Sequence, residues 1–311
     1  MKVRSLVLIC SIVLLCFAEL NAQSVKLLRM IDFQKGAKDK SISTLIFGKK
    51  QDKDLKPGSL CQIGLDKFAI TDAVNGLVLI IDGRGKIQKK ISHAGKLKLI
   101  SPVGVCVDNK GSLYVSDSAR GGVFRYDARH KYKGIFLIPP NSRITGILFA
   151  KGIFFCVDTR NHRILSFDGD GELTKSFGGR GSGQGEFNFP THIAADNEYI
   201  YVTDALNFRI QIFDFRGEFI RAIGSPGRGG GNFSKPKGMA VDTKRRIFVA
   251  DAEFDNIQIF NFEGEFLYHF GGPGHQDGEF WLPSGVMAHS DGTIWVVDTY
   301  NTRIQVFKVV E

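Results

Sequence analysis

The sequence has few cysteines and tryptophans, and beyond its first residues it has no long apolar run. Of its 5 cysteines, none belongs to the C-x-x-C-H motif that attaches haem. Cys61, Cys106 and Cys156 each lie within an apolar run, which favours buried free thiols over a disulfide bond. No segment sustains the 3.6-residue apolar period of a helix. These absences argue against a helical domain and against a membrane-spanning one.

The first residues form a segment of their own. Lys2 and Arg4 precede an apolar run at 6–18, and Asn21-Ala22 then offers a small residue for cleavage. The run is shorter than the roughly 20 residues of a spanning helix, and the pattern is typical of a secretory signal peptide. We therefore expect residues 1–22 to be removed and residues 23–311 to be exported to the periplasm, the cell surface or the medium. An uncleaved N-terminal anchor is the alternative.

A glycine-rich stretch, FGGRGSGQGEFNFP at 177–190, raises the question of a phosphate-binding loop. Two copies of it follow at the same length, IGSPGRGGGNFSKP at 223–236 and FGGPGHQDGEFWLP at 270–283. A site for one nucleotide is not expected three times, and no βαβ unit surrounds these glycines. The copies instead predict connectors between repeated structural units.

An aspartate marks each repeated unit, in segments such as VTDALNFRIQIF at 202–213 and VVDTYNTRIQVF at 296–307. Each unit has four short apolar stretches separated by turn residues, and the clearest of them alternate apolar and polar side chains as strands do. Four strands repeated six times are typical of a β-propeller. The six aspartates, 41 to 47 residues apart, are Asp72, Asp117, Asp158, Asp204, Asp251 and Asp298.

The last unit ends after its third strand, so the ring needs a strand from elsewhere. We expect residues 41–48, SISTLIFG, to supply it and close the ring, with 25–33, VKLLRMIDF, as the other candidate. A proline opens the first strand of most units, where a missing N–H is tolerated. The predicted blades are 57–100, 101–142, 143–189, 190–235, 236–282 and 283–311.

The copies resemble NHL repeats, whose pattern is roughly P-x-G-(I/V)-A-V-D, an apolar strand and D-x-x-N-x-R-I-x-x-F. The segment PKGMAVDTKRRIFVADAEFDNIQIFNFEGEFLYHFG at 236–271 follows it closely. The resemblance covers about residues 41–311 and is weakest in the first two units, where Gly76, Leu77, Gly121 and Gly122 break the N-x-R pattern. It implies an all-β, six-bladed propeller of four-stranded antiparallel blades. Such propellers are usually binding scaffolds, and the fold does not fix a function.

Some NHL relatives are enzymes, so the resemblance also raises a metal site in the central channel. The similar peptidylglycine α-amidating lyase holds zinc with histidines around a P-H-G type motif. Here the residue after each strand-opening proline is never histidine, and the histidines follow no three-fold pattern. We predict no catalytic residue, no metal and no cofactor, and keep an exported lyase or hydrolase as the alternative. The positions concerned are Gly58, Val103, Thr191, Lys237, Ser284, His192, His162, His269, His275 and His289.

The aspartate and arginine of D-x-x-N-x-R are candidates for a charged ligand ring. Because the pair recurs in several blades, we interpret it as a structural ion pair instead. The pairs are Asp158 with Arg163, Asp204 with Arg209, and Asp298 with Arg303.

Blade connectors and the turns between second and third strands open on one face of a propeller, which predicts a loop-rich binding rim. The net charge of +9 favours an acidic protein or an anionic cell-surface polymer as partner. Basic clusters at 49–56, 86–98, 129–133 and 235–246 also raise RNA binding, but the signal peptide disfavours nucleic acid. Arginine and aromatic residues are favoured at binding hot spots. The predicted rim residues are Arg120, Arg160, His162, Arg180, Phe208, Arg228, Phe254, His275 and Tyr300.

Overall fold

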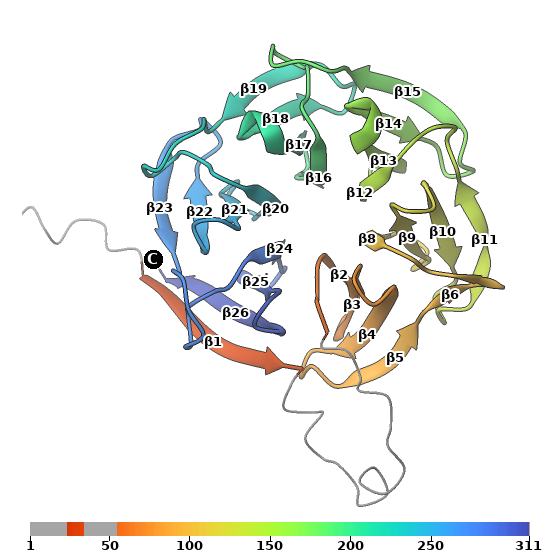
Figure 1. The fold of residues 1–311 in the computed structure, drawn as a ribbon, viewed down its shortest axis with the longest axis horizontal. Coiled ribbons are helices and arrows are strands. Elements are labelled where there is room, and N and C mark those ends of the chain that lie inside the picture. Colours follow the sequence, from red (N-terminus) through yellow and green to blue (C-terminus); the bar gives the residue numbers. More distant parts are fainter. Residues whose placement is uncertain (1–23, 34–54, 311) are drawn as a thin grey trace, which may run out of the picture.

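The computed structural model describes residues 24–33 and 55–310, which form six four-stranded antiparallel sheets around a central axis. Viewed down its short axis, the molecule is a ring with the first strand of each sheet innermost (Figure 1). This is the predicted six-bladed β-propeller. Within the described residues the only helical segments are two short 3-10 turns, η2 (Thr159–Asn161) and η3 (Ala205–Asn207). None of the described helices is long and apolar enough to cross a membrane.

The first three blades each use consecutive strands. Blade 1 contains β2 (Leu60–Gly64), β3 (Lys67–Asp72), β4 (Leu77–Asp82) and β5 (Ile87–Ile91). Blade 2 contains β8 (Pro102–Val107), β9 (Leu113–Asp117), β10 (Gly122–Tyr126) and β11 (Tyr132–Leu137), and follows a small hairpin of β6 (His93–Ala94) and β7 (Leu97–Lys98). Blade 3 contains β12 (Ile144–Ala150), β13 (Ile153–Asp158), β14 (Arg163–Phe167) and β15 (Leu173–Gly178).

The next two blades repeat the arrangement, and the last blade has three consecutive strands. Blade 4 contains β16 (Pro190–Ala195), β17 (Tyr199–Asp204), β18 (Arg209–Asp214) and β19 (Phe219–Ile223). Blade 5 contains β20 (Pro236–Val241), β21 (Ile247–Asp251), β22 (Asn256–Phe260) and β23 (Phe266–Phe270). Blade 6 contains β24 (Pro283–Ala288), β25 (Thr293–Asp298) and β26 (Arg303–Val310).

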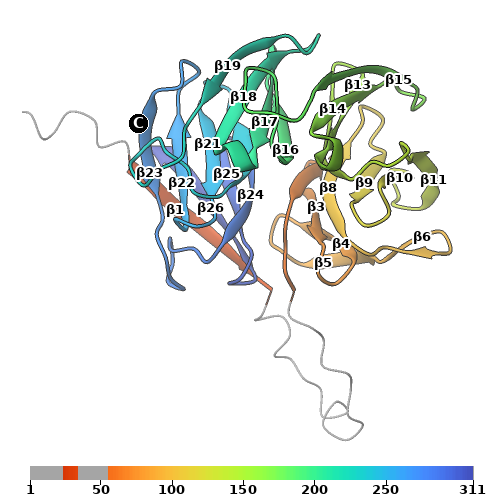
Figure 2. The same cartoon turned by 45° about the horizontal axis from the view of Figure 1, so that its top comes forward.

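The ring is closed by β1 (Ser24–Asp32), which pairs antiparallel with β26 from Ser24 opposite Val310 to Asp32 opposite Arg303. Figures 1 and 2 show β1 on the outer edge of the last blade. The prediction that residues 41–48 close the ring is wrong, because β1 occupies the free edge of β26; residues 41–48 lie outside the described part of the chain. A bulge between Leu27 and Arg29 shifts the register of β1 and lets Ile31 point inward.

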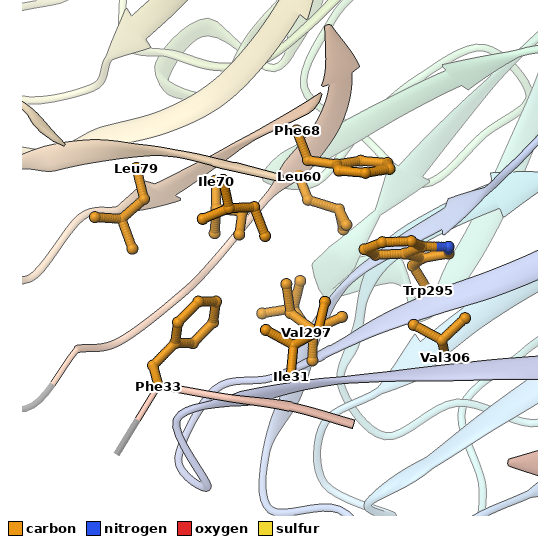
Figure 3. Close-up of a cluster of buried hydrophobic side chains, with 11 residues drawn as sticks. Ile31, Phe33, Leu60, Phe68, Ile70, Leu79, Trp295, Val297 and Val306 are labelled. Carbon is orange, nitrogen blue, oxygen red and sulfur yellow. The ribbon is translucent and has the colours of Figure 1, made fainter. Parts of the chain in front are cut away.

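The apolar core is divided into six clusters, each made mainly from side chains of two neighbouring blades. Figure 3 shows the cluster where the ring closes, in which side chains of β1, blade 1 and blade 6 point toward one another. Phe68 of blade 1 stacks on Trp295 of blade 6 with ring centroids 4.2 Å apart. Ile31 packs into the same cluster and is buried. The closing strand therefore seals the interface between the first and last blades.

The inner strands approach one another so closely that most of them need glycine two places after the start of the strand. A Cβ built on Gly238 of β20 would lie 2.3 Å from the carbonyl oxygen of Ser284 on the next blade. The equivalent residues in the other blades are Ser59, Gly104, Gly146, His192 and Gly285. The channel along the axis is consequently narrow, and His192 carries the largest side chain at this level.

The three described cysteines are free thiols. Cys106 and Cys156 are buried in the cluster between blades 2 and 3. Burial raises the pKa of both thiols and keeps them protonated, so they act as small apolar side chains in the core.

Replacing Ile31 by alanine tests the closing strand. Ile31 is 4% exposed, so Ile31→Ala leaves a cavity between the first and last blades and should lower the free energy of unfolding by about 2–5 kcal/mol. The matched control is Leu28→Ala on the same strand, where the side chain is 48% exposed and the change should be within about 0.5 kcal/mol. Urea denaturation measures both. Equal, small effects of the two variants would show that β1 does not close the ring.

Candidate functional site

The loop-rich face is organised by the repeated aspartates. Each is the last residue of the second strand of its blade, and all six are fully buried. Asp204 accepts hydrogen bonds from the backbone N–H of Asn188 at 2.6 Å, from Asn207 Nδ2 at 2.8 Å and from Arg209 Nε at 2.8 Å. The carboxylate thus joins the turn between the second and third strands to the connector that enters the blade.

The same contacts recur in the other copies of the motif. Arg163 Nε lies 3.1 Å from Asp158 Oδ2, and Arg303 Nε lies 2.7 Å from Asp298 Oδ2. The arginine then continues to the connector: Arg303 Nη2 donates to the carbonyls of Gln276 and Glu279, each at 2.8 Å. Arg209 and Arg303 therefore join the buried carboxylate to the connector of their blade, and the purely structural role of these pairs stays a prediction.

A buried glutamine completes this network and was missed from the sequence. Gln211 donates to the carbonyl of Glu186 at 2.6 Å and accepts from the N–H of Gly185 at 3.0 Å. Gln305 makes the same pair of bonds, to Glu279 and Gly278. The signal was the dipeptide Ile-Gln, which recurs at 210–211, 257–258 and 304–305 near the start of the third strand of blades 4, 5 and 6.

The glycine-rich stretch at 177–190 is a blade connector in the structure. Its Phe187 is fully buried, and a Cβ on Gly178 (φ 93°) would lie 2.6 Å from the Phe187 ring. The equivalent phenylalanines, Phe233 and Phe280, are also fully buried. The glycines therefore make room for a packed aromatic side chain and for the positive φ of the turn.

A cavity of about 710 Å³ opens on this face between blades 2 and 3. Its walls are the turn after β9, the connector at 138–143, the start of η2, and Phe189. The connector at 138–143 is the shortest between successive described blades. The others are longer and span 92–101, 179–189, 224–235 and 271–282. The cavity lies where a long glycine-rich loop is missing.

Three arginines, Arg120, Arg143 and Arg160, line this cavity. We call it the arginine cleft. The Arg120 guanidinium donates from Nε and Nη2 to the carbonyl of Lys98, at 2.8 and 2.6 Å, which holds it in place. The side chains of Arg143 and Arg160 are exposed and form no ion pair with a described residue. No aspartate or glutamate is among the described residues that line the cleft.

The buried carboxylate beneath the arginine cleft does not neutralise the positive charge of the arginines that line it. Asp158 is fully buried below the η2 turn. Burial by itself raises the pKa of this carboxyl, but hydrogen bonds from Asn161, the Arg143 amide, Ser142 and Arg163 outweigh it and lower the pKa. Because the Asp158 charge is already matched by these donors, it does not serve as an ion-pair partner for the guanidinium groups of Arg143 and Arg160.

The central channel narrows to a throat of about 70 Å³, lined in part by His192 of β16. Burial, together with the positive charge of Lys237, lowers the pKa of His192 to about 4. Nδ1 of His192 lies 3.0 Å from the hydroxyl of Thr191. The imidazole is therefore neutral at neutral pH and lines the channel as a polar but uncharged group.

The predicted rim residues are spread around the ring instead of forming one site. Arg120 and Arg160 line the arginine cleft, whereas Phe208 lines a second cavity at the mouth of the channel. Arg180 and Arg228 are exposed on the connectors that enter blades 4 and 5, and Phe254 is half-buried in the turn after β21. Arg143 and Lys237, which line the two cavities, were not predicted as site residues.

Two further rim residues belong to an aromatic group on blade 6. The rings of His275 and Tyr300 both contact the ring of Trp281, with centroids 5.2 and 5.4 Å from it. His162 differs from the expectation of an accessible side chain. It is 7% exposed, and its Nδ1 accepts a hydrogen bond from the N–H of Phe189 at 3.1 Å. His162 therefore supports the connector and is not free to contact a partner.

No three His, Cys, Asp or Glu side chains come together as a metal site within residues 24–33 and 55–310. His192 is the one histidine among the residues lining the channel; its neighbours there are glycine, hydroxyl and apolar residues together with two lysines, Lys235 and Lys237.

Comparison with known families agrees with the repeat and the ring. A family model described as a 6-bladed beta-propeller matches residues 140–207 and 193–269, and the NHL repeat model matches residues 280–307. The chain is a six-bladed β-propeller whose last blade is an NHL repeat. No curated protein matches the propeller in sequence.

Solved structures with the same fold include binding proteins and enzymes. An auxiliary nutrient binding protein from Bacteroides thetaiotaomicron has a TM-score of 0.66 at 12% identity, over 83% of the propeller and 70% of that chain. A gluconolactonase from Xanthomonas campestris has a TM-score of 0.64 at 14% identity, over 83% and 87%. Virginiamycin B lyase from Staphylococcus aureus has a TM-score of 0.60 at 15% identity, over 92% and 100%. At these identities the likeness is one of fold alone.

Removing the charge of a repeated aspartate tests the loop network. In Asp298→Asn the Arg303 guanidinium, whose side chain is 6% exposed, loses its charged partner, and the free energy of unfolding should fall by about 3–5 kcal/mol. Asp277→Asn, on an exposed part of the same connector, should change it by less than about 0.5 kcal/mol. Equilibrium denaturation compares the two. A loss at Asp298 no larger than at Asp277 would contradict a structural role for the pair.

Acidification tests the neutral His192. Above pH 6.5 the imidazole is neutral in both the folded and the unfolded chain, so it contributes nothing to pH dependence. Between pH 6.5 and about 4 the unfolded chain takes up a proton that the folded chain does not, so stability falls as the pH falls.

His192→Gln removes this contribution and should lose less stability between pH 6.5 and 4 than the unmodified protein. Urea denaturation at several pH values measures the difference. His93→Gln, on the exposed hairpin, serves as the control and should leave the pH profile unchanged. An identical profile for His192→Gln and the unmodified protein would mean that the channel imidazole is protonated as readily in the folded state.

Proposed function

We propose that the propeller is an exported, non-enzymatic binding protein that holds an anionic cell-surface polymer in the arginine cleft. The observation that carries the proposal is the meeting of Arg120, Arg143 and Arg160 around one cavity without a lining carboxylate. Guanidinium groups recognise carboxylate and phosphate groups in a bidentate manner, and the cavity is within the usual size range of ligand sites. Phe189, which is 42% exposed, adds a flat apolar surface at the wall.

The position of the closing strand is compatible with export. β1 begins at Ser24, directly after the predicted signal peptide at 1–22, so cleavage there would leave the ring complete. Residues 1–22 themselves lie outside the described part of the chain. The nutrient-binding protein from Bacteroides thetaiotaomicron supports a binding role for such a fold, without identifying the partner. The alternative of an exported lyase or hydrolase lacks a supporting group of metal ligands in the described residues.

Charge reversal in the cleft tests the proposal. The double variant Arg143→Glu with Arg160→Glu should bind polygalacturonate, a carboxylated polymer, roughly tenfold or more weakly, because two charge-assisted contacts become repulsive. The matched control is Lys110→Glu with Arg129→Glu, which changes the net charge equally. Lys110 and Arg129 are exposed in the turns between β8 and β9 and between β10 and β11, at the end of blade 2 opposite to the arginine cleft. Calorimetry at fixed, moderate salt measures binding, with neutral dextran as the uncharged probe.

The outcomes are distinguishable. A loss confined to the cleft variant supports the assignment, whereas an equal loss in both double variants would reduce the binding to non-specific charge attraction. Tighter binding of an acidic peptide such as polyglutamate, lost in the same cleft variant, would replace the polymer by a protein as partner. Binding of dextran as tight as that of polygalacturonate would overturn the role of the arginines.

A further inference from the structure

The mouth of the central channel holds a second cavity of about 370 Å³, separate from the arginine cleft. It is formed by the residues at the starts of β2, β8, β16, β20 and β24 and by the turn between β17 and β18. Val103, Leu206 and Phe208 give it a largely apolar wall. Several of its hydroxyl groups already bond to backbone: Thr71 donates to the carbonyl of Val103 and Ser284 to that of Gly58, both at 3.1 Å. Their bonds join neighbouring blades.

Lys237 is the charged residue of the inner strands at this level. It occupies the position after the strand-opening proline, where the equivalent residues Gly58, Val103, Thr191 and Ser284 are small or apolar. Lys237 is half-buried and lines the cavity, and no aspartate or glutamate is among the described residues that line it. Its ammonium group has no ion-pair or hydrogen-bond partner in the described part of the chain. An unpaired cation in apolar surroundings is unfavourable, and a bound anion would relieve this cost.

The surroundings of Lys237 also disfavour the charged form of its side chain. Burial lowers the pKa of Lys237, and the neighbouring Lys235 lowers it further. A carboxylate bound beside it would oppose both effects, because an opposite charge favours the charged form of the ammonium group.

His192 forms the floor of the same cavity. It comes from the neighbouring blade and lines both the mouth and the narrow throat below it. Nδ1 of His192 lies beside the Thr191 hydroxyl. The other ring nitrogen, Nε2, is a further polar atom that carries no charge while the imidazole is neutral. Because the throat below measures only about 70 Å³, a ligand must be held at the mouth.

We propose that the channel mouth binds a small organic acid with an apolar body. The ligand's carboxylate pairs with the Lys237 ammonium beside His192, and its hydrocarbon or aromatic body packs against Val103, Leu206 and Phe208. Lys235, which also lines the cavity, is exposed and adds to the positive charge that favours a carboxylate there. The apolar wall disfavours strongly hydrated ligands such as free sugars. The site is independent of the polymer binding proposed for the arginine cleft.

Isothermal titration calorimetry of the purified protein with octanoate and 3-phenylpropionate tests the site. We expect one-to-one binding of at least one of them; which one binds more tightly distinguishes an aliphatic from an aromatic ligand. Lys237→Met keeps the stem of the side chain but removes the charge, and should weaken binding at least tenfold. Lys90→Met makes the same change on an exposed outer strand and should leave binding unaltered. Acetate has the carboxylate with almost no hydrocarbon, and 1-octanol has the hydrocarbon without the carboxylate. Titrating both separates the contributions of the ligand's carboxylate and of its apolar body.

A second variant keeps the test independent of the lysine. Val103→Phe narrows the cavity while leaving Lys237 in place, and should also abolish octanoate binding. A cooperative thermal unfolding transition in each variant, at or above the melting temperature of the unmodified protein for Lys237→Met, verifies that the two variants are folded. Equal octanoate binding by the unmodified protein and Lys237→Met would overturn the proposal, as would acetate binding as tightly as octanoate. The absence of binding by both acids would overturn it as well.

Discussion

The fold of the loop-rich face depends on one buried carboxylate in each blade. Asp204 accepts hydrogen bonds from a connector amide, from Asn207 and from Arg209, and the other five aspartates hold equivalent positions. A buried carboxylate without such donors would be strongly destabilising, so the connector and the turn can take up their places only together. The face is thereby rigid, and its cavities have walls that do not depend on a ligand.

Both cavities occur where the repeat is broken. The arginine cleft opens beside the short connector at 138–143, and the channel-mouth cavity contains Lys237 where other blades have small or apolar residues. The repeated residues are occupied with each other: Arg209 and Arg303 hold connectors and are not available to a ligand. In this propeller the repeated residues build the framework of the loop-rich face, and the arginines and the lysine without a carboxylate partner occur where a blade departs from the repeat.

Much of this architecture could be predicted from periodicity, because each unit repeats the same strands and the same aspartate. The closing strand could not, since 25–33 and 41–48 both resemble strands and only the pairing with β26 decides between them. Arg143 was missed although the 41-residue spacing between Asp117 and Asp158 is shorter than the others and signals a short connector. Lys237 was missed because nothing in its local sequence shows that it faces a cavity. His162 was expected to be accessible, but its left-handed backbone at the end of η2 turns the imidazole toward Phe189.

The closing pair of strands also determines the order in which the molecule can fold. Blades 1 to 5 each consist of consecutive strands and can form from local contacts, whereas Ser24 meets Val310 only when nearly the whole chain is available. Contacts of such large sequence separation are the slowest to form, because the chain must close its longest loop first. Until then the interface between the first and last blades is open, with Phe68 and Trp295 unpaired and the edge of β26 free. A chain whose two ends have not met therefore leaves a strand edge and apolar side chains exposed, and these are the features that favour aggregation.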